Sequence, residues 1–293
     1  MNDRIKKLRI QSTETKPALS AERAKLITRF YKTIHTSAIS LPVQRAMAFK
    51  YILEHKQIFI NEGELIVGER GPGPQQCPTY PEICVHSIKD LDILKNRDKV
   101  PFYSDEETAA AYKNEIIPFW QGNSIRDAMF QELEQPWKDA YEAGVFTEFM
   151  EQRPPGHTTL DDKIYRKGMI DFIKEMEENI SHFEKNEMQQ EIEEMKAMKI
   201  AAEAIILLAN RHADKLEQMA GLEQNTIRKS EMHELASICR KVPAHAPETF
   251  HEALQHYWFI HVGVITEVNP WDSFNPGRLD QHLYPFFKKE LEA

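Results

Sequence analysis

The apolar positions of this chain recur mainly at the three- and four-residue spacing of amphipathic helices. In the first half of the chain, the pattern predicts helices that begin at Ser20 and at Pro42 and helices over 104–119 and 136–144. Ser and Pro are both favoured at helix starts, which supports these boundaries. The fold class predicted for this part of the chain is therefore mainly α.

The second half is predicted to hold longer helices, over 161–183 and 189–219, followed by helices over 229–240 and from 248 onward. The helix over 189–219 carries an apolar stripe rich in methionine, which is typical of a core face rather than of a cofactor pocket. The helix from 248 is apolar on most sides, so we expect it to lie deep, with Pro247 in its first turn. The last residues, 283–293, resemble the opening of a helix that then stops. We therefore expect a fragment of a longer protein.

Two segments in the first half depart from the helical pattern. Residues 64–69, Glu-Leu-Ile-Val-Gly-Glu, follow a turn at 61–63 and are the best strand candidate in the chain. Residues 70–82 form a loop rich in Pro and Gly that cannot be helical. Tyr80 and Glu82 in this loop could point into a cleft, although a packed position is the favoured interpretation for Tyr80.

A first polar bend follows the predicted helix over 136–144. Residues 149–158 place Phe149, Glu151, Arg153 and His157 around two prolines and a glycine. Pro and Gly end regular structure, and polar side chains on a stiff bend backed by helices are a common way to build a site. The alternative interpretation is a surface loop whose charged groups are solvated.

A second polar bend, over 267–282, emerges from the apolar helix that starts at 248. It contains Asp272, a carboxylate suited to bind a cationic group. Arg278 and Asp280 are interpreted as structural contacts at a helix start. The two bends could meet in one pocket, with Phe149 as an apolar wall and His157 as a proton donor or acceptor.

Composition and charge narrow the function classes. The 293 residues are 41% hydrophobic and 28% charged, which suits one large globular domain or two ordinary ones. The net charge of −9 disfavours a nucleic acid or an anionic membrane as partner. The longest apolar stretches, 204–209 and 257–265, are too short to span a bilayer, so we expect no membrane segment. An odd, low count of three cysteines fits a reducing cytosol, which predicts a cytoplasmic protein.

Several common catalytic patterns are missing from the sequence. It has no phosphate-binding glycine loop, no H-E-x-x-H and no G-x-S-x-G. Cys77, Cys84 and Cys239 have no metal-ligand spacing, and we interpret them as small hydrophobic residues. The four histidines between 245 and 261 have no i, i+4 pair, so they are interpreted as packed or surface residues. No metal site is expected.

The motifs at the two bends resemble a known family. Glu-Gln-Arg-Pro-Pro-Gly-His-Thr at 151–158, Pro-Glu-Thr-Phe-His-Glu-Ala-Leu-Gln at 247–255 and Pro-Gly-Arg-Leu-Asp-Gln at 276–281 are similar to the N-terminal region of glycyl radical enzymes of the pyruvate formate-lyase type. The similarity runs along the whole chain and includes 61–69. Within this superfamily, 78–84, 146–153 and 267–274 are most similar to the hydroxyproline dehydratases.

The resemblance implies a ten-stranded α/β barrel wrapped in helices, of which residues 1–293 would be the mainly helical N-terminal part of one domain. It implies a glycyl radical, outside this chain, that is installed by an S-adenosylmethionine radical activase. The full-length form would be a homodimer. The family's thiyl cysteine and its radical glycine are expected beyond residue 293, so the chain alone is expected to be inactive.

The resemblance also implies roles for three residues. Phe149 matches the position that packs on the pyrrolidine ring of trans-4-hydroxy-L-proline. His157 matches the position near the leaving hydroxyl. Asp272 matches a position that makes a polar contact to the substrate, through the ammonium group of the substrate. The reaction would remove water and give a pyrroline carboxylate. Two alternatives remain. The first is another enzyme of the superfamily, which would act on a diol, an amine or an arylacetate or resemble formate acetyltransferase. The second is a non-catalytic helical module.

Overall fold

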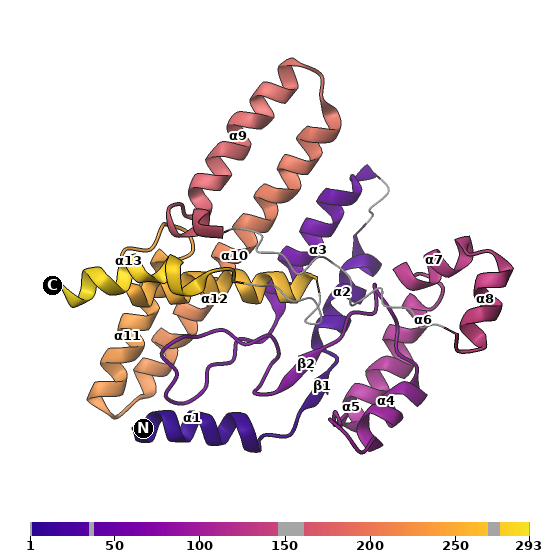
Figure 1. Ribbon diagram of the computed structural model, residues 1–293, viewed down its shortest axis with the longest axis horizontal. Helices are drawn as coiled ribbons and strands as arrows, with labels where there is room; N and C mark the ends of the chain where they lie inside the picture. The colour runs from indigo at the N-terminus through magenta and orange to yellow at the C-terminus, as the bar shows by residue number, and fades with distance from the viewer. Residues whose placement is uncertain (1, 35–37, 146–160, 269–275, 293) are drawn as a thin grey trace.

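The computed structural model describes residues 2–34, 38–145, 161–268 and 276–292, and this part of the chain is mainly α-helical, as predicted (Figure 1). Its first half holds α1 (Asp3–Glu14), α2 (Glu22–Thr33), α3 (Leu41–His55), α4 (Ile88–Asn96), α5 (Glu106–Ala111), the π-helical turn η2 (Tyr112–Ile116), α6 (Ile117–Trp120), α7 (Ile125–Glu132) and α8 (Gln135–Glu142). Its second half holds the 3-10 helix η4 (Asp161–Tyr165), α9 (Met169–Lys185), α10 (Gln189–Leu222), α11 (Thr226–Lys241), α12 (Phe250–Glu267) and α13 (Leu279–Leu291).

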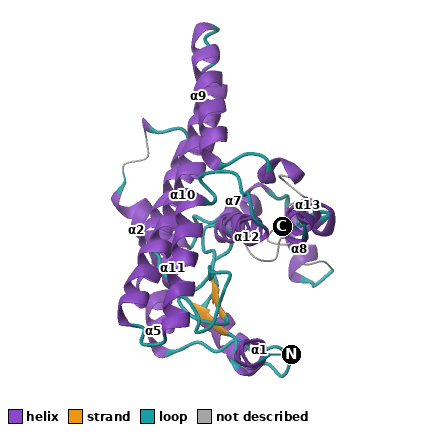
Figure 2. Cartoon of the chain, turned by 90° about the vertical axis from the view of Figure 1, so that its left-hand side faces the viewer, coloured by secondary structure: helices purple, strands orange, loops and turns teal. Residues whose placement is uncertain are grey.

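The long helix α10 organises the packing of the second half. It runs antiparallel to α9, and the two helices project beyond the others in both ribbon views (Figures 1 and 2). Helices α3, α11 and α12 pack along the rest of α10. Leu208 and Leu216 of α10 join Phe49 of α3 and Phe259 of α12 in one buried cluster. The apolar stripe predicted over 189–219 therefore faces the core.

A two-stranded parallel sheet is present, but not where the sequence predicts a strand. It pairs β1 (Ala18–Ser20) with β2 (Gln76–Pro78), and β2 lies inside the Pro/Gly loop over 70–82. The predicted strand over 64–69 is wrong, because side chains rather than a neighbouring strand pair with its backbone. The buried Gln255 amide of α12 accepts from Val67 N and donates to Val67 O, both at 2.8 Å.

The same segment is held by two further side chains. Trp258 Nε1 of α12 donates to Gly68 O at 2.8 Å. The buried Lys56 ammonium donates to Glu69 O at 2.6 Å and to Arg70 O at 3.1 Å, and burial lowers the pKa of Lys56 to about 8. Buried backbone groups need partners, and here α12 and Lys56, which directly follows α3, supply them. The segment is therefore extended without belonging to a sheet.

Several helix boundaries differ from the predicted ones. The predicted helix over 161–183 is split, because η4 ends before α9 begins at Met169. The backbone at Gly168 packs so closely against the turn that follows α11 that a Cβ there would lie 2.3 Å from Ala244 O. Pro247 lies outside α12, whose N-cap is Thr249. The helix predicted over 104–119 is interrupted by η2 just before Pro118, a residue that has no N–H to donate to the preceding turn.

Two short helices, α4 and α7, are absent from the predicted set. Each begins with a capping box, in which a serine and the aspartate three residues later bond to each other's backbone. These pairs are Ser87 with Asp90 and Ser124 with Asp127. The helices are only nine and eight residues long, too short for a clear apolar period.

Two buried histidines make the stability of this fold depend on pH. Burial lowers the pKa of His212 in α10 and of His256 in α12 to about 4. Both rings are therefore neutral in the folded chain, whereas an unfolded histidine titrates near pH 6.5. The contribution of these two histidines to the free energy of unfolding is therefore fully present above about pH 6.5 and is lost as the pH drops towards 4. At pH 5 the loss is roughly 2 kcal/mol per histidine.

We predict that His256→Gln loses part of this dependence. The free energy of unfolding in urea, measured at pH 7.5 and pH 5, should differ less between the two pH values for His256→Gln than for the unsubstituted chain. His182 in α9 is exposed, and His182→Gln is the matched control that should retain the full difference. An equal pH difference in all three proteins would contradict the assignment.

Candidate functional site

The three predicted site residues, Phe149, His157 and Asp272, lie outside the described residues. The first polar bend lies within 146–160, and residues 269–275 of the second bend are also outside the described residues. The structure describes what precedes and follows each of these two segments. The roles of the three residues therefore stay predictions. The structure does show how the residues that flank these two segments are held.

The elements that follow the two segments contact each other. Asp161, the first described residue after 160, opens η4, and His282 lies in the first turn of α13. His282 Nε2 is 3.1 Å from Asp161 Oδ1. Tyr165 of η4 lies beside the same imidazole, with ring centroids 5.7 Å apart. That the two bends themselves converge stays a prediction, but the elements that follow them are in contact.

The C-terminal end of α12, just before the second segment, is held by side chains from distant parts of the chain. The last carbonyls of a helix have no partner within the helix. Here Tyr80 Oη donates to Ile265 O, and Arg23 Nε of α2 donates to Thr266 O at 2.6 Å. A guanidinium at this position also complements the negative end of the helix dipole.

Arg23 is buried and forms a two-point contact with a carboxylate. Its Nη2 and Nη1 lie 2.5 Å and 3.2 Å from the two carboxylate oxygens of Glu82, and its Cζ is 3.9 Å from the centroid of the Tyr80 ring. Burial by itself would lower the pKa of Arg23, but the Glu82 carboxylate outweighs it and the pKa is raised. Arg23 is 4% exposed, so this charge depends on Glu82 for compensation.

A second ion pair lies at the same helix end. Arg45 Nε of α3 is 2.5 Å from Glu267 Oε1, at the last residue of α12. Burial raises the pKa of Glu267, and the guanidiniums of Arg45 and Arg23 oppose that rise. We call Arg23, Arg45, Tyr80, Glu82 and Glu267 the α12 anchor. It ties α2, α3 and the 79–82 loop to the point where the second segment starts.

The anchor decides two interpretations of the sequence. Tyr80 is packed, as favoured, and Glu82 pairs with Arg23 instead of pointing into a cleft. Arg23 was not singled out by the sequence, although it lies at helical spacing from Ile27 and Phe30 on the buried face of α2. An arginine on an apolar face is the signal that could have identified it, because a buried charge requires a partner.

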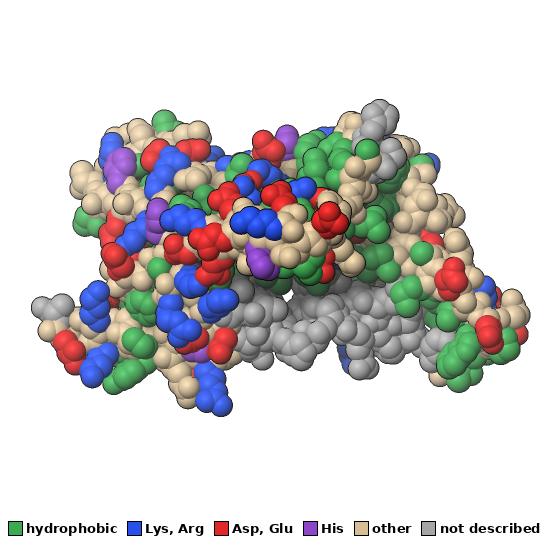
Figure 3. Space-filling model, turned by 90° about the horizontal axis from the view of Figure 1, so that it is seen from above, with side chains coloured by type: hydrophobic (Ala, Val, Ile, Leu, Met, Phe, Trp, Pro, Cys, Tyr) green, Lys and Arg blue, Asp and Glu red, His purple; other side chains and the backbone are tan. Residues whose placement is uncertain are grey.

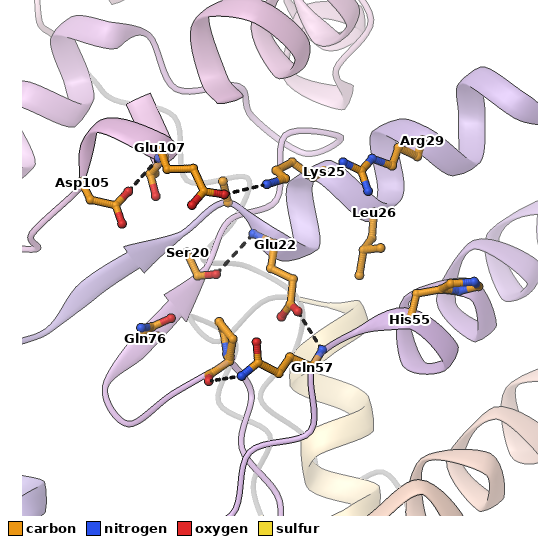
Figure 4. Close-up of a pocket in the computed structure, with 13 residues that line it drawn as sticks. Ser20, Glu22, Lys25, Leu26, Arg29, His55, Gln57, Gln76, Asp105 and Glu107 are labelled. Atoms are coloured by element: carbon orange, nitrogen blue, oxygen red, sulfur yellow. Dashed lines mark hydrogen bonds and ion pairs between the residues drawn. The ribbon is translucent and has the colours of Figure 1, made fainter. Parts of the chain in front are cut away.

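A polar cavity of about 410 Å³ lies away from the anchor, between α2, the end of α3 and the start of α5 (Figure 4). Several of its charged groups are bonded within its own wall. Lys25 Nζ lies 3.2 Å from Glu107 Oε1, and Glu22 Oε1 accepts from Gln57 N at 2.7 Å. We therefore assign it no ligand.

An apolar cavity of about 360 Å³ lies closer to the second segment, between α3, α10 and α12. Phe49, Ile205 and Gly263 line it, and the Arg45–Glu267 ion pair is at its rim. Gly263 lets α12 approach α10, since a Cβ there would lie 3.1 Å from Ile205 Cδ1. This cavity is thus part of the packing that places the end of α12.

Metal and surface features add little to the site. Across 2–34, 38–145, 161–268 and 276–292, no group of three or more His, Cys, Asp or Glu side chains could hold a metal ion. No helix in these ranges is long and apolar enough to cross a membrane. On the face shown in Figure 3, acidic and basic side chains are interspersed rather than gathered by sign.

We predict that Arg23→Met destabilises the fold strongly. It removes one partner of a buried pair and leaves Glu82 and the carbonyl of Thr266 without their donor, which costs about 3–5 kcal/mol. Arg29→Met on the same helix is the control. Arg29 is half exposed and lies 3.6 Å from Glu115, so its loss should cost less than about 1 kcal/mol. Urea unfolding compares the two, and equal costs would refute the role of Arg23.

Comparison with known proteins places the whole chain among enzymes. The model of the pyruvate formate lyase-like family matches residues 1–293. Trans-4-hydroxy-L-proline dehydratase of Clostridioides difficile is 46% identical over 293 residues, which are 99% of this chain and 37% of the relative. Isethionate sulfite-lyase of Oleidesulfovibrio alaskensis is 30% identical, over 94% of this chain and 35% of the relative.

A solved structure gives the same result for the fold. The crystal structure of hydroxyproline dehydratase from Clostridioides difficile with trans-4-hydroxy-L-proline bound superposes with a TM-score of 0.93 at 45% identity. The match covers 100% of this chain and 37% of that one. The chain thus spans little more than a third of the length of the relatives it matches.

Proposed function

Because the chain belongs to the pyruvate formate lyase-like family, we propose that it forms the N-terminal part of a glycyl radical dehydratase that removes water from trans-4-hydroxy-L-proline. The product would be a pyrroline carboxylate. The observation that carries the proposal is the 46% identity to trans-4-hydroxy-L-proline dehydratase along essentially the whole chain. The isethionate sulfite-lyase shares the same region at only 30%.

In this proposal, three residues of the chain form part of the substrate pocket. The Phe149 ring packs on the pyrrolidine ring and keeps water from it. His157 protonates the departing hydroxyl group, which turns a poor leaving group into water. Asp272 accepts a charge-assisted hydrogen bond from the substrate ammonium. The α12 anchor supports this arrangement, because it fixes the end of the helix from which the segment with Asp272 continues.

The hydrogen-abstraction chemistry would come from a thiyl cysteine outside these residues, formed by a glycyl radical that an S-adenosylmethionine radical activase installs. Cys77 and Cys239 do not suit a part in it, because both are buried in packed structure. Residues 1–293 alone are therefore proposed to be inactive. The full-length protein is proposed to be a cytoplasmic homodimer.

A second candidate keeps the family and changes the substrate. The isethionate sulfite-lyase is similar over 94% of this chain, so one scaffold serves different leaving groups. A diol, an amine or an arylacetate would then replace hydroxyproline. A third candidate, a non-catalytic helical fragment, has no specific observation in its favour.

We predict that the activated full-length protein converts trans-4-hydroxy-L-proline and that His157→Ala abolishes most of this conversion. Loss of a general acid lowers kcat by about 10²–10⁴-fold. The glycyl radical signal in electron paramagnetic resonance should stay at the level of the unsubstituted protein. The exposed His182→Ala is the control and should retain full turnover.

Two results would contradict this account. Turnover of His157→Ala near that of the unsubstituted protein would remove the general-acid role. Conversion of isethionate or a diol by the activated unsubstituted protein, with none of hydroxyproline, would replace the proposed substrate.

A further inference from the structure

We propose that the apolar cavity between α3, α10 and α12 is a docking groove for an apolar segment that carries a positive charge, supplied by the same polypeptide beyond residue 293. The groove has a volume of about 360 Å³. The inference goes beyond the proposed function, because it holds whatever substrate the full-length protein takes.

The groove is lined by apolar side chains from three helices. Phe49 of α3, Ala201 and Ile205 of α10 and Val264 of α12 contribute to it. Its outer edge is accessible, since Met198 of α10 also lines it and is 48% exposed. Water against an apolar surface is unfavourable, and apolar depressions between helices are a common place for a peptide segment to bind. An occupant would therefore present an apolar side chain.

The charges at the rim indicate the sign of the occupant's charge. The charged residues that line the groove are two carboxylates, Glu194 and Glu267, and one guanidinium, Arg45. Arg45 pairs with Glu267. Glu194 is exposed, and the neighbouring Glu193 is the carboxylate that pairs with Lys196. The rim thus keeps an excess of negative charge, which a Lys or Arg on the occupant would complement.

The Glu267 carboxyl supports the same sign. Burial raises its pKa, and the opposing effect of the Arg45 and Arg23 guanidiniums does not cancel that rise. Its negative charge is therefore incompletely compensated by the described part of the chain. A further cation at the rim would stabilise the ionised form.

The comparison with relatives indicates where the occupant comes from. Residues 1–293 match one family model throughout, yet 99% of this chain corresponds to only 37% of trans-4-hydroxy-L-proline dehydratase. Most of such a relative thus lies outside the matched region. A segment of the same polypeptide is present at an effective concentration of about millimolar, far above that of a separate protein or a second copy. The rest of the chain is therefore the favoured occupant.

The first test asks whether the groove is covered in the unsubstituted full-length protein. Met198 and Met129 of α7 have nearly equal exposure here, 48% and 50%, so Met129 is a matched control. Peroxide oxidises exposed methionines to the sulfoxide, which mass spectrometry quantifies for each residue. Met198 should be oxidised several-fold more slowly than Met129. Equal rates would show an open groove and overturn the proposal.

The second test identifies the occupant. The full-length protein is made with the photoreactive amino acid p-benzoylphenylalanine in place of Met198, at the exposed edge of the groove. After irradiation, the main crosslinked peptide should belong to the same polypeptide beyond residue 293. It should also carry a Lys or Arg within about four residues of the crosslinked position, one helical turn away. A crosslink to a second copy, seen as a dimer in a denaturing gel, or to a position within 1–293 would overturn the proposal.

Two charge reversals on α10 test the sign of the occupant. Glu194→Lys places a positive charge at the rim and should lower the crosslink yield by about threefold or more at low salt. Lys196→Glu changes an exposed charge of the same helix by the same amount. Because residues two apart lie on opposite faces of a helix, its yield should stay within about twofold. Equal yields in the two variants would contradict a cationic occupant.

Discussion

One buried guanidinium sets the arrangement on which the rest of this structure depends. Arg23 is buried on α2, bonds to Glu82 in the loop before α4 and donates to the end of α12. A charge in this position is tolerated only with its partners in place, so the three segments must assemble together. Once they do, the C-terminal end of α12 has a fixed position and direction. The segment proposed to contact substrate continues from that point.

The same logic explains which parts of the fold the sequence predicts. Helices such as α10 can be predicted because the spacing of their apolar residues is contained in one continuous segment. The stripe through Leu208 and Leu216 does face the core. The strand predicted over 64–69 fails because Gln255 and Trp258, about 190 residues away, pair with its backbone. No local pattern contains that information. The partners of Arg23 are equally distant, so its role appears only in three dimensions.

The site was predicted by a different route from the fold. Phe149, His157 and Asp272 stand out first by their residue types on two polar bends, and their roles toward hydroxyproline come from the resemblance of their motifs to a family. The comparisons confirm the family, and the structure shows that Asp161 and His282, which follow the two segments, lie 3.1 Å apart. The substrate stays a proposal, since relatives that share this region act on substrates as different as hydroxyproline and isethionate.

A crystal structure of the full-length protein with trans-4-hydroxy-L-proline is the most direct test of the central claim, that the two bends form one wall of the substrate pocket. The account predicts the Phe149 ring against the pyrrolidine ring, the His157 imidazole within hydrogen-bond distance of the 4-hydroxyl and the Asp272 carboxylate beside the ammonium. It also predicts an intact contact between Asp161 and His282. Substrate bound away from both bends, or contacted by one bend alone, would contradict it.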